Sequence, residues 1–277
     1  MTQTTFDFII VGAGSAGCVL ANRLSADKNC RVLLLEAGSD DGDPMIQTPG
    51  LFPQLQDSAY DWGDRSMPQS GMNDRRIYIP QGKALGGSSS INYMIYMRGN
   101  RGDYEHWANL GNAGWGYDEV LPYFIKAETN LAFHDAYHGQ SGPLIVSSHV
   151  QLSPVTQRYL SAAQEVGIAY NPDFNGERQE GCGPLQRTIA NGQRCSAAVA
   201  YLHPVMARPN LTVMRHAHAT QLLFNGSRVI GVQYLQLGVT ESAYAGEVLL
   251  SAGAFRSPQL LLLSGLGPAQ ELEKTGY

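Results

Sequence analysis

A strand, a glycine-rich turn and a helix at the N-terminus constrain the fold of this 277-residue chain most. The apolar run 8–11 shows no alternation of polar and apolar residues, which is typical of a strand buried on both faces of a parallel sheet. Gly12, Gly14 and Gly17 follow with the spacing G-x-G-x-x-G and lead into the helix-compatible segment 18–25. This order predicts the first half of a nucleotide-binding βαβ unit.

Each glycine has its own physical role in such a unit. The first permits the tight turn, the second lets the backbone approach a pyrophosphate, and the third lets helix and strand pack closely. The phosphates then lie at the positive end of the helix. A second aliphatic run, 32–35, ends at Glu36, whose carboxylate can accept hydrogen bonds from ribose hydroxyls. The unit predicts a dinucleotide site, and by itself it does not distinguish NAD from FAD.

Composition excludes several other classes of protein. The net charge is −5 and no basic stripe is visible, so we expect no nucleic-acid partner. The four cysteines show no C-x-x-C spacing, which favours unpaired thiols and a cytoplasmic location. The N-terminal apolar run stops at Gly12, too early to span a bilayer, so any membrane contact would be peripheral.

Two further glycine-rich stretches accompany the N-terminal unit. Residues 82–92 read G-K-A-L-G-G-S-S-S-I-N, and residues 253–267 read G-A-F-R-S-P-Q-L-L-L-L-S-G-L-G. With these three motifs, which together span nearly the whole chain, the sequence resembles the glucose-methanol-choline oxidoreductases, flavoproteins that oxidise alcohols with FAD. Shorter matches such as H-G-Q-S-G-P-L resemble the choline dehydrogenase-like branch of that family.

The resemblance implies an α/β fold: a doubly wound FAD-binding sheet with the glycine-rich βαβ unit, plus the beginning of a β-rich substrate domain. We expect residues 1–150 to form the first part of the FAD-binding domain, 151–192 a segment of the substrate domain, and 193–277 the rest of the FAD-binding domain. Some relatives attach FAD covalently through a histidine where this chain has Ile91, so noncovalent FAD is expected.

By position, the resemblance also assigns the residues around the cofactor. The pyrophosphate should be lined by Gly12, Gly14, Ser15, Ala16 and Gly17. The adenosine ribose should meet Glu36, the adenine should meet the backbone at Ala219, and the flavin should have Trp62 and Gly82 nearby. The residues expected along the pyrophosphate and the isoalloxazine are Gly87, Ser88, Asn92, Tyr93, Met94 and Ile95.

The implied activity is oxidation of a small primary alcohol to an aldehyde. A base removes the hydroxyl proton while hydride passes from carbon to flavin N5, and oxygen or a quinone then reoxidises the flavin. Two alternatives stay open: a nonredox hydroxynitrile lyase on the same fold, and a flavin-binding fragment without catalysis. The G-A-G-S-A-G stretch lacks the G-x-S-x-G register of a nucleophile elbow, which disfavours a hydrolase.

The catalytic base of the family, a histidine followed later by a second histidine or an asparagine, lies in a C-terminal segment. None of the seven histidines here occupies a matching position, so we assign no catalytic residue. We therefore expect a truncated chain that, expressed alone, binds FAD poorly and turns over negligibly. His216 and His218 lack a third ligand nearby, and His134 and His138, at i, i+4 spacing, lack the following Glu of a zincin-like site, so no metal site is expected.

Four local structures are also predicted. Residues 153–166 should form a helix, and Asn225-Gly226 should turn a hairpin. In the last motif, Ser257 should cap a helix that has Pro258 in its first turn. His216 and His218 should alternate along one strand.

Overall fold

The computed structural model describes residues 5–148 and 151–275. The chain forms two compact units. The first unit comprises residues 1–92 and 196–277, and the second comprises residues 93–195. Among the described residues, none of the helices has the length and apolar character that crossing a bilayer demands.

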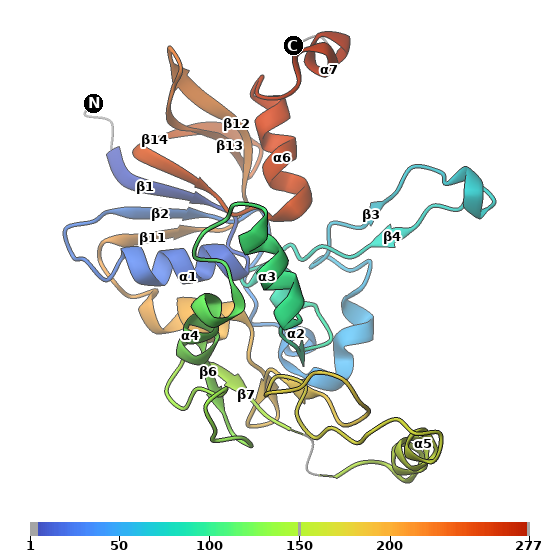
Figure 1. Cartoon of the computed structure of the whole chain (residues 1–277). Helices are drawn as coiled ribbons and strands as arrows, with labels where there is room; N and C mark the ends of the chain where they lie inside the picture. Colours follow the sequence, from blue (N-terminus) through green and yellow to red (C-terminus); the bar gives the residue numbers. More distant parts are fainter. Residues whose placement is uncertain (1–4, 149–150, 276–277) are drawn as a thin grey trace. The chain divides into compact units, whose positions relative to one another are not determined.

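A six-stranded mixed sheet organises the first unit (Figure 1). Its strands, in spatial order, are β11 (Leu211–Met214), β2 (Val32–Leu35), β1 (Thr5–Val11), β14 (Val239–Leu250), β13 (Arg228–Gln236) and β12 (Ala217–Asn225). The first four strands run parallel to one another, and β12, β13 and β14 form an antiparallel meander. This is the α/β sheet that the sequence predicts, because segments 32–35 and 247–250 both flank β1.

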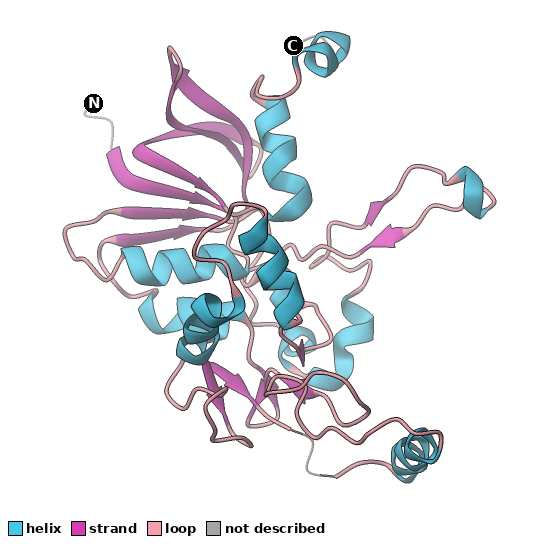
Figure 2. Ribbon diagram, viewed as in Figure 1, coloured by secondary structure: helices cyan, strands magenta, loops and turns pink. Residues whose placement is uncertain are grey.

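The sheet is covered on both faces, which explains the unbroken apolar run in β1. Ile9 packs in a buried cluster with Leu33 and Val232, and that cluster includes Leu260 of α6 (Gly253–Leu263). Helix α1 (Ser15–Leu24) contacts β1 and β2, and a side-chain methyl of Ile10 lies next to Gly17 of this helix. Figure 2 shows α1 and α6 beside the strands of this sheet. Alternate residues of one strand therefore face different helices.

The parallel strands bring three loops to one edge of the sheet. Val11 is in register with Leu35 of β2 and with Leu250 of β14. The chain leaves all three strands at this carboxyl edge, where α/β sheets bind ligands. The remaining helical elements of the first unit are α2 (Pro44–Gln47), α7 (Ala269–Thr275), the 3-10 helices η1 (Pro49–Leu55), η2 (Ser70–Met72), η3 (Gly87–Ser90) and η5 (His203–Val205), and the π-helix η4 (Ala198–Leu202).

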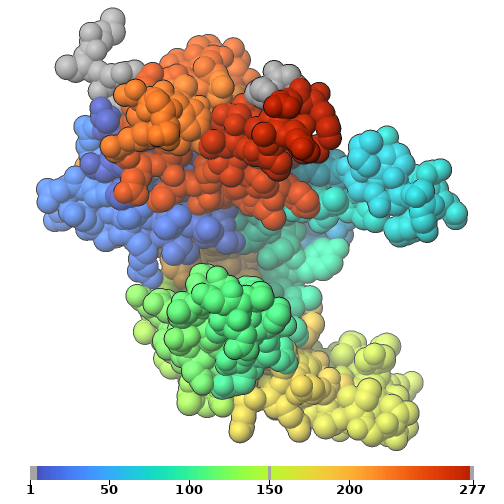
Figure 3. All heavy atoms as spheres, turned by 45° about the horizontal axis from the view of Figure 1, so that its top comes forward, coloured from blue at the N-terminus to red at the C-terminus, as the bar shows by residue number. Residues whose placement is uncertain are grey.

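A two-stranded arm extends from the first unit. It is made by β3 (Asp64–Arg65) and β4 (Tyr78–Ile79), which pair antiparallel, with η2 at its tip. Figure 3 shows this arm, in cyan, protruding from the surface. The arm lies within the loop-rich stretch that follows β2 in the chain.

The second unit contains short elements joined by long loops. Its helices are α3 (Arg101–Asn109), α4 (Tyr117–Ala127) and α5 (Pro154–Glu165). Its strands are β5 (Ile95–Tyr96), β6 (Glu128–Asn130), β7 (Leu144–Val146), β8 (Gln186–Arg187), β9 (Ile189–Ala190) and β10 (Gln193–Arg194). The compact units divide the chain at residues 92 and 195, whereas the sequence suggests functional domains of 1–150, 151–192 and 193–277. That functional assignment stays a prediction.

The local predictions have mixed outcomes. Helix α5 begins after Ser153, whose hydroxyl accepts a hydrogen bond from the Thr156 N–H, and Gly226 turns the β12–β13 hairpin with a φ of 60°, so both predictions are confirmed. The predicted start of the helix in the motif 253–267 is wrong. Helix α6 begins at Gly253, which places Pro258 inside the helix, and the Ser257 hydroxyl accepts a hydrogen bond from the Ala252 N–H one turn earlier.

Candidate functional site

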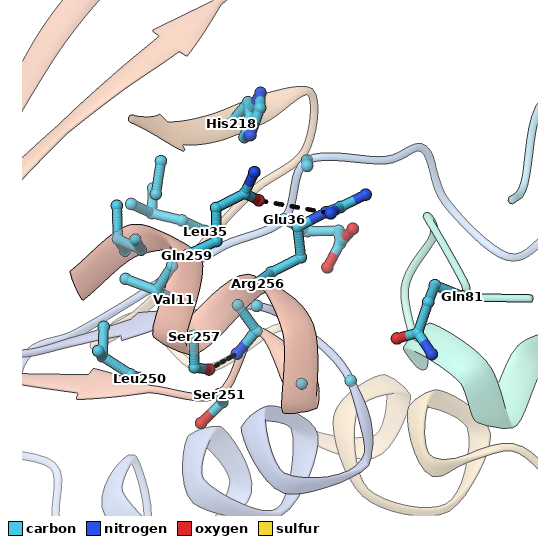
Figure 4. A pocket seen from close by; sticks show the side chains of 18 of the residues that line it. Val11, Leu35, Glu36, Gln81, His218, Leu250, Ser251, Arg256, Ser257 and Gln259 are labelled. Atoms are coloured by element: carbon cyan, nitrogen blue, oxygen red, sulfur yellow. Dashed lines mark hydrogen bonds between the residues drawn. The ribbon is translucent and has the colours of Figure 1, made fainter. Parts of the chain in front are cut away.

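A cavity of about 450 Å³ lies in the first unit at the carboxyl ends of β1, β2 and β14. Its wall includes Val11, Leu35 and Leu250, the last residues of those strands, and side chains from β12 and α6 (Figure 4). This volume is within the range of small-molecule and cofactor pockets. The cavity therefore occupies the place where the sequence predicts a dinucleotide.

The three glycines of the first loop are needed for different reasons. A Cβ on Gly12, at a φ of 97°, would lie 2.6 Å from the Ser251 carbonyl oxygen, and one on Gly17 would lie 1.9 Å from the Gly12 oxygen. A Cβ on Gly14 would meet nothing closer than that Ser251 oxygen at 3.8 Å. The fold therefore requires Gly12 and Gly17, whereas Gly14 leaves bare backbone on the cavity wall, as close approach of a ligand would require.

The first turn of α1 presents backbone donors to the cavity. Gly14 is the N-cap residue and provides no side-chain cap, and no acidic residue occupies the first turn. Ser15 and Ala16 of this turn line the cavity. Early helical N–H groups have no carbonyl partner within their own helix, and they carry the positive end of the helix dipole. This arrangement is suited to binding an anion such as a pyrophosphate.

The second glycine cluster packs directly against the first. The Gly86 N–H donates to the Ala13 carbonyl oxygen over 2.8 Å, and a Cβ on Gly87 would lie 2.7 Å from the Gly14 Cα. The Gly82 N–H donates to the Ser88 hydroxyl over 3.1 Å. Two segments about 70 residues apart in the sequence thus form one wall of the cavity because neither carries side chains at the contact.

Glu36 holds the loop together from the end of β2. One carboxylate oxygen accepts from the Ala13 N–H and the other from the Gly38 N–H, each over 2.8 Å. The carboxylate is buried and lines the cavity. Burial raises the pKa of Glu36 above its usual range, and the backbone donors oppose that shift. Because each carboxylate oxygen has two acceptor sites, the carboxylate retains capacity for a ribose hydroxyl.

A cluster of aromatic and cationic side chains forms the wall between β12 and α6. The Trp62 ring centroid lies 4.3 Å from the Arg256 guanidinium carbon, 4.7 Å from the Lys83 ammonium and 5.3 Å from the His218 ring centroid. Arg256 pairs with Asp64 over 2.8 Å. Burial, Lys83 and Arg256 lower the pKa of His218, so its imidazole is neutral at neutral pH.

The prediction that His216 and His218 alternate along one strand is wrong, because β12 begins after His216.

Ten of the fifteen predicted cofactor residues line this cavity. They are Gly12, Gly14, Ser15, Ala16, Glu36, Trp62, Gly82, Gly87, Ser88 and Ala219. Gly17 is not in the lining and instead allows α1 to pack against the turn. Asn92 also lies outside the lining, while Tyr93, Met94 and Ile95 belong to the second unit. The roles of all fifteen towards a cofactor stay predictions.

Several lining residues were not assigned from the sequence. Arg256 and Gln259 come from α6, and His218 comes from β12 next to Ala219 (Figure 4). Arg256 and Gln259 fall inside the motif 253–267, so that motif is the sequence feature from which they could have been identified. Which of its side chains face the cavity depends on the start of α6 at Gly253, which the sequence did not reveal.

The second unit contains a buried network of charges. His138 lies 2.7 Å from Glu128 through Nδ1 and 2.8 Å from Asp173 through Nε2, and Glu128 also pairs with Arg98 over 3.0 Å. Burial alone would lower the pKa of His138, but the two carboxylates raise it to about 9. Asp135 also lies near His138 and Asp173, with possible ligand atoms within 4.8 Å. Both ring nitrogens of His138 face carboxylate oxygens, so in this structure these side chains form an ion-pair network.

The cavity in the first unit fits the adenosine diphosphate part of a dinucleotide. Two glycine clusters and the start of α1 offer backbone donors and space for a pyrophosphate, and Glu36 lies at the end of the second strand for a ribose. The open backbone at Gly14 is the observation that favours a bound ligand over simple packing, since the protein itself does not require glycine there.

Comparison with known proteins gives consistent results. The family model described as GMC oxidoreductase matches residues 6–275. The chain is 46% identical over 276 residues to a protein of Pseudomonas putida named alcohol dehydrogenase (acceptor), covering 98% of this chain and 50% of that protein. It is 45% identical over 278 residues to the mitochondrial choline dehydrogenase of Mus musculus, covering 97% and 47%.

A solved structure has the same architecture. Pyridoxine 4-oxidase from Mesorbium loti superposes with a TM-score of 0.94 at 36% identity, over 98% of this chain and 54% of that one. The chain thus spans about half the length of the relatives that it matches.

Proposed function

Because this chain belongs to the GMC oxidoreductase family, whose model matches residues 6–275, we propose that it provides the FAD-binding part of an alcohol-oxidising enzyme. The enzyme would act on CH–OH groups and convert a primary alcohol to an aldehyde. The observation that carries the proposal is the cavity at the carboxyl ends of β1, β2 and β14, with bare backbone at Gly14 and a buried carboxylate at Glu36.

The residues of the cavity bind and orient the cofactor in this proposal. The N–H groups at the start of α1 and the backbone of the two glycine clusters hold the pyrophosphate. Glu36 accepts hydrogen bonds from the adenosine ribose and, through Ala13, also fixes the glycine loop. Ala219 meets the adenine with its backbone. FAD is bound noncovalently, since Ile91 stands where a tethering histidine would be.

When bound, FAD supplies the redox chemistry by accepting hydride from the alcohol carbon. We assign no catalytic residue to this chain. Among the described histidines, His218 is the one that lines the cavity, and it lies on β12 beside Ala219, at the adenosine side of the proposed site. We therefore place no base for the alcohol's hydroxyl proton among the residues that line the cavity. We propose that the chain alone turns over negligibly.

The proposal also covers the substrate and the electron acceptor of the enzyme. The relatives are named for alcohol and choline, which supports a small alcohol as substrate. One relative, from Photobacterium profundum, is named oxygen-dependent choline dehydrogenase, which supports oxygen as an acceptor, with a quinone as the alternative. We propose a cytoplasmic location, with any membrane contact peripheral.

Reduction of bound flavin by an alcohol tests the chemistry. Residues 1–275 are fused to the part of the Pseudomonas putida relative that follows its matched region, and the chimera is loaded with FAD under anaerobic conditions. We expect a panel of primary alcohols to bleach the oxidised flavin band and to yield aldehydes. A persistent oxidised spectrum with every alcohol would defeat the oxidoreductase proposal. Release of cyanide from a hydroxynitrile under those conditions would favour the lyase.

A further inference from the structure

Arg256 is fixed in place by three neighbours on the cavity wall. One terminal nitrogen of its guanidinium lies 2.8 and 2.9 Å from the two carboxylate oxygens of Asp64, and the other lies 3.4 Å from the Gln259 side-chain oxygen. The guanidinium carbon lies 4.3 Å from the centre of the Trp62 ring. Figure 4 shows Arg256 and Gln259 together on α6. A planar cation is therefore held in one orientation before any ligand arrives.

The same guanidinium has unused hydrogen-bonding capacity. Its buried Nε–H has no hydrogen-bond partner among the described residues. An unpaired buried donor is costly, and a ligand acceptor would relieve that cost. Arg256 lines the cavity, so this capacity lies in the wall of the site that the proposed function uses.

The position of this wall relative to Glu36 suggests which part of a dinucleotide meets it. The Ala217 N–H donates to the Glu36 carbonyl oxygen, so the start of β12 adjoins the end of β2. His218 follows directly, and its ring lies 5.3 Å from that of Trp62. With the adenosine ribose at Glu36, the phosphates would lie against the glycine loops. The adenine base would then face the wall formed by Trp62, His218 and Arg256.

We propose that Arg256, stacked on Trp62 and anchored by Asp64, is the residue that recognises the adenine ring of FAD, with His218 completing the subsite. The proposal rests on the proposed function, and it moves Trp62 from the surroundings of the flavin to those of the adenine. Guanidinium planes stack on aromatic rings, and a nucleobase offers such a ring with acceptor nitrogens at its edge. An uncharged imidazole adds hydrogen bonding without a further positive charge.

Adenosine diphosphate and inorganic pyrophosphate are the two probes that test this role. Both contain the phosphates, but only the first contains the base. Their affinities for the purified chain are measured by calorimetry in the wild type, Arg256→Gln and Arg256→Lys. The matched control is Arg228→Gln, an exposed arginine on the β12–β13 hairpin outside the cavity lining. Urea unfolding of each variant checks that the fold is retained.

We expect both Arg256 variants to lose roughly 5- to 100-fold in affinity for adenosine diphosphate, the range for one stacked base. Arg256→Lys keeps the charge but not the planar stacking surface, so its pyrophosphate affinity should stay within about twofold of the wild type. The control should match the wild type with both probes. Adenosine diphosphate should also change Trp62 emission, measured with Trp107 and Trp115 replaced by Phe, and pyrophosphate should not.

Three results would overturn the inference. Equal losses for both probes would show that Arg256 acts on the phosphates or on the fold. Full retention of adenosine diphosphate affinity in Arg256→Lys would show that charge, not stacking, matters. Unchanged affinity in Arg256→Gln would remove the role altogether. Failure of the wild type to bind adenosine diphosphate, pyrophosphate and FAD would instead contradict the proposed function itself, and the inference with it.

Discussion

Glu36 shows how one buried carboxylate serves both the loop and the proposed ligand. Each of its oxygens already accepts one backbone N–H, from Ala13 or Gly38. Sequence spacing predicted an acid at this position for a ribose, but not its role in holding the glycine loop. The reason is that the contact with Ala13 spans 23 positions in the sequence and depends on the register of β1 and β2.

Replacing Glu36 with Gln should weaken FAD binding and also loosen the loop. Gln keeps one oxygen acceptor but turns an N–H₂ group towards one of the two backbone donors, which should cost about 1–3 kcal/mol of unfolding free energy. Loss of a charge-assisted hydrogen bond to the ribose should lower FAD affinity by roughly 10- to 100-fold. Urea unfolding and fluorescence titration measure the two effects. Wild-type FAD affinity in Glu36→Gln would show that other groups hold the ribose.

His138 should make the stability of the chain depend on pH. Its pKa is raised from 6.5 to about 9 by Asp173 and Glu128, so its contribution is complete below pH 6.5 and is lost as the pH rises through about 9. His138→Gln removes this cation from between the buried carboxylate of Glu128 and the partly buried carboxylate of Asp173, and should cost about 3–5 kcal/mol at pH 6.5. Urea unfolding at pH 6.5 and pH 9 should show the gap between wild type and variant narrowing. A gap of constant size would contradict a charged His138.

In the glycine loop between β1 and α1, the glycines that the fold needs differ from the glycine that the ligand needs. Gly14→Ala should change the unfolding free energy by no more than about 1 kcal/mol, the loss expected at an N-cap, because its φ is −73° and the space is open. It should still reduce FAD affinity, since the methyl group enters the path of the pyrophosphate. Titration with FAD and urea unfolding measure these effects.

Gly12→Ala is the matched control for Gly14→Ala. At a φ of 97°, with a Cβ 2.6 Å from a carbonyl oxygen, it should lose at least about 2 kcal/mol of stability. Equal stability losses in the two variants would show that Gly14 has a packing role after all.

Sequence patterns predicted the elements whose signals are local. The βαβ unit, helix α5 and the Asn225-Gly226 hairpin all follow from short-range spacing, capping and turn chemistry. The start of α6 did not follow, because Ser257-Pro258 has the chemistry of a helix start while the helix already begins at Gly253 and the Ser257 hydroxyl bonds back to the Ala252 N–H. The Trp62, His218 and Arg256 wall combines three distant segments, and no local pattern reveals such a contact.

Across the molecule as a whole, apolar side chains remain exposed at the end of α6 and just beyond it. Leu262 is 41% exposed and Leu266 just beyond the helix is 43% exposed, whereas Leu260 of the same helix is 4% exposed and packs on the sheet. The double variant Leu262→Gln/Leu266→Gln should reduce self-association, measured by light scattering against concentration, with little change in unfolding free energy. Leu260→Gln should instead destabilise the first unit by several kcal/mol, about 2–5. Unchanged scattering in the double variant would show that this surface does not drive association.

If the cavity in the first unit binds the adenosine diphosphate part of FAD, equilibrium calorimetry should distinguish FAD from FMN. The two ligands share the flavin, and FMN lacks the adenosine monophosphate moiety. We expect one weakly bound FAD per chain, displaced competitively by adenosine diphosphate, and FMN binding that is weaker still by at least about tenfold. Equal affinity for FMN, or FAD that adenosine diphosphate does not displace from a folded chain, would contradict this expectation.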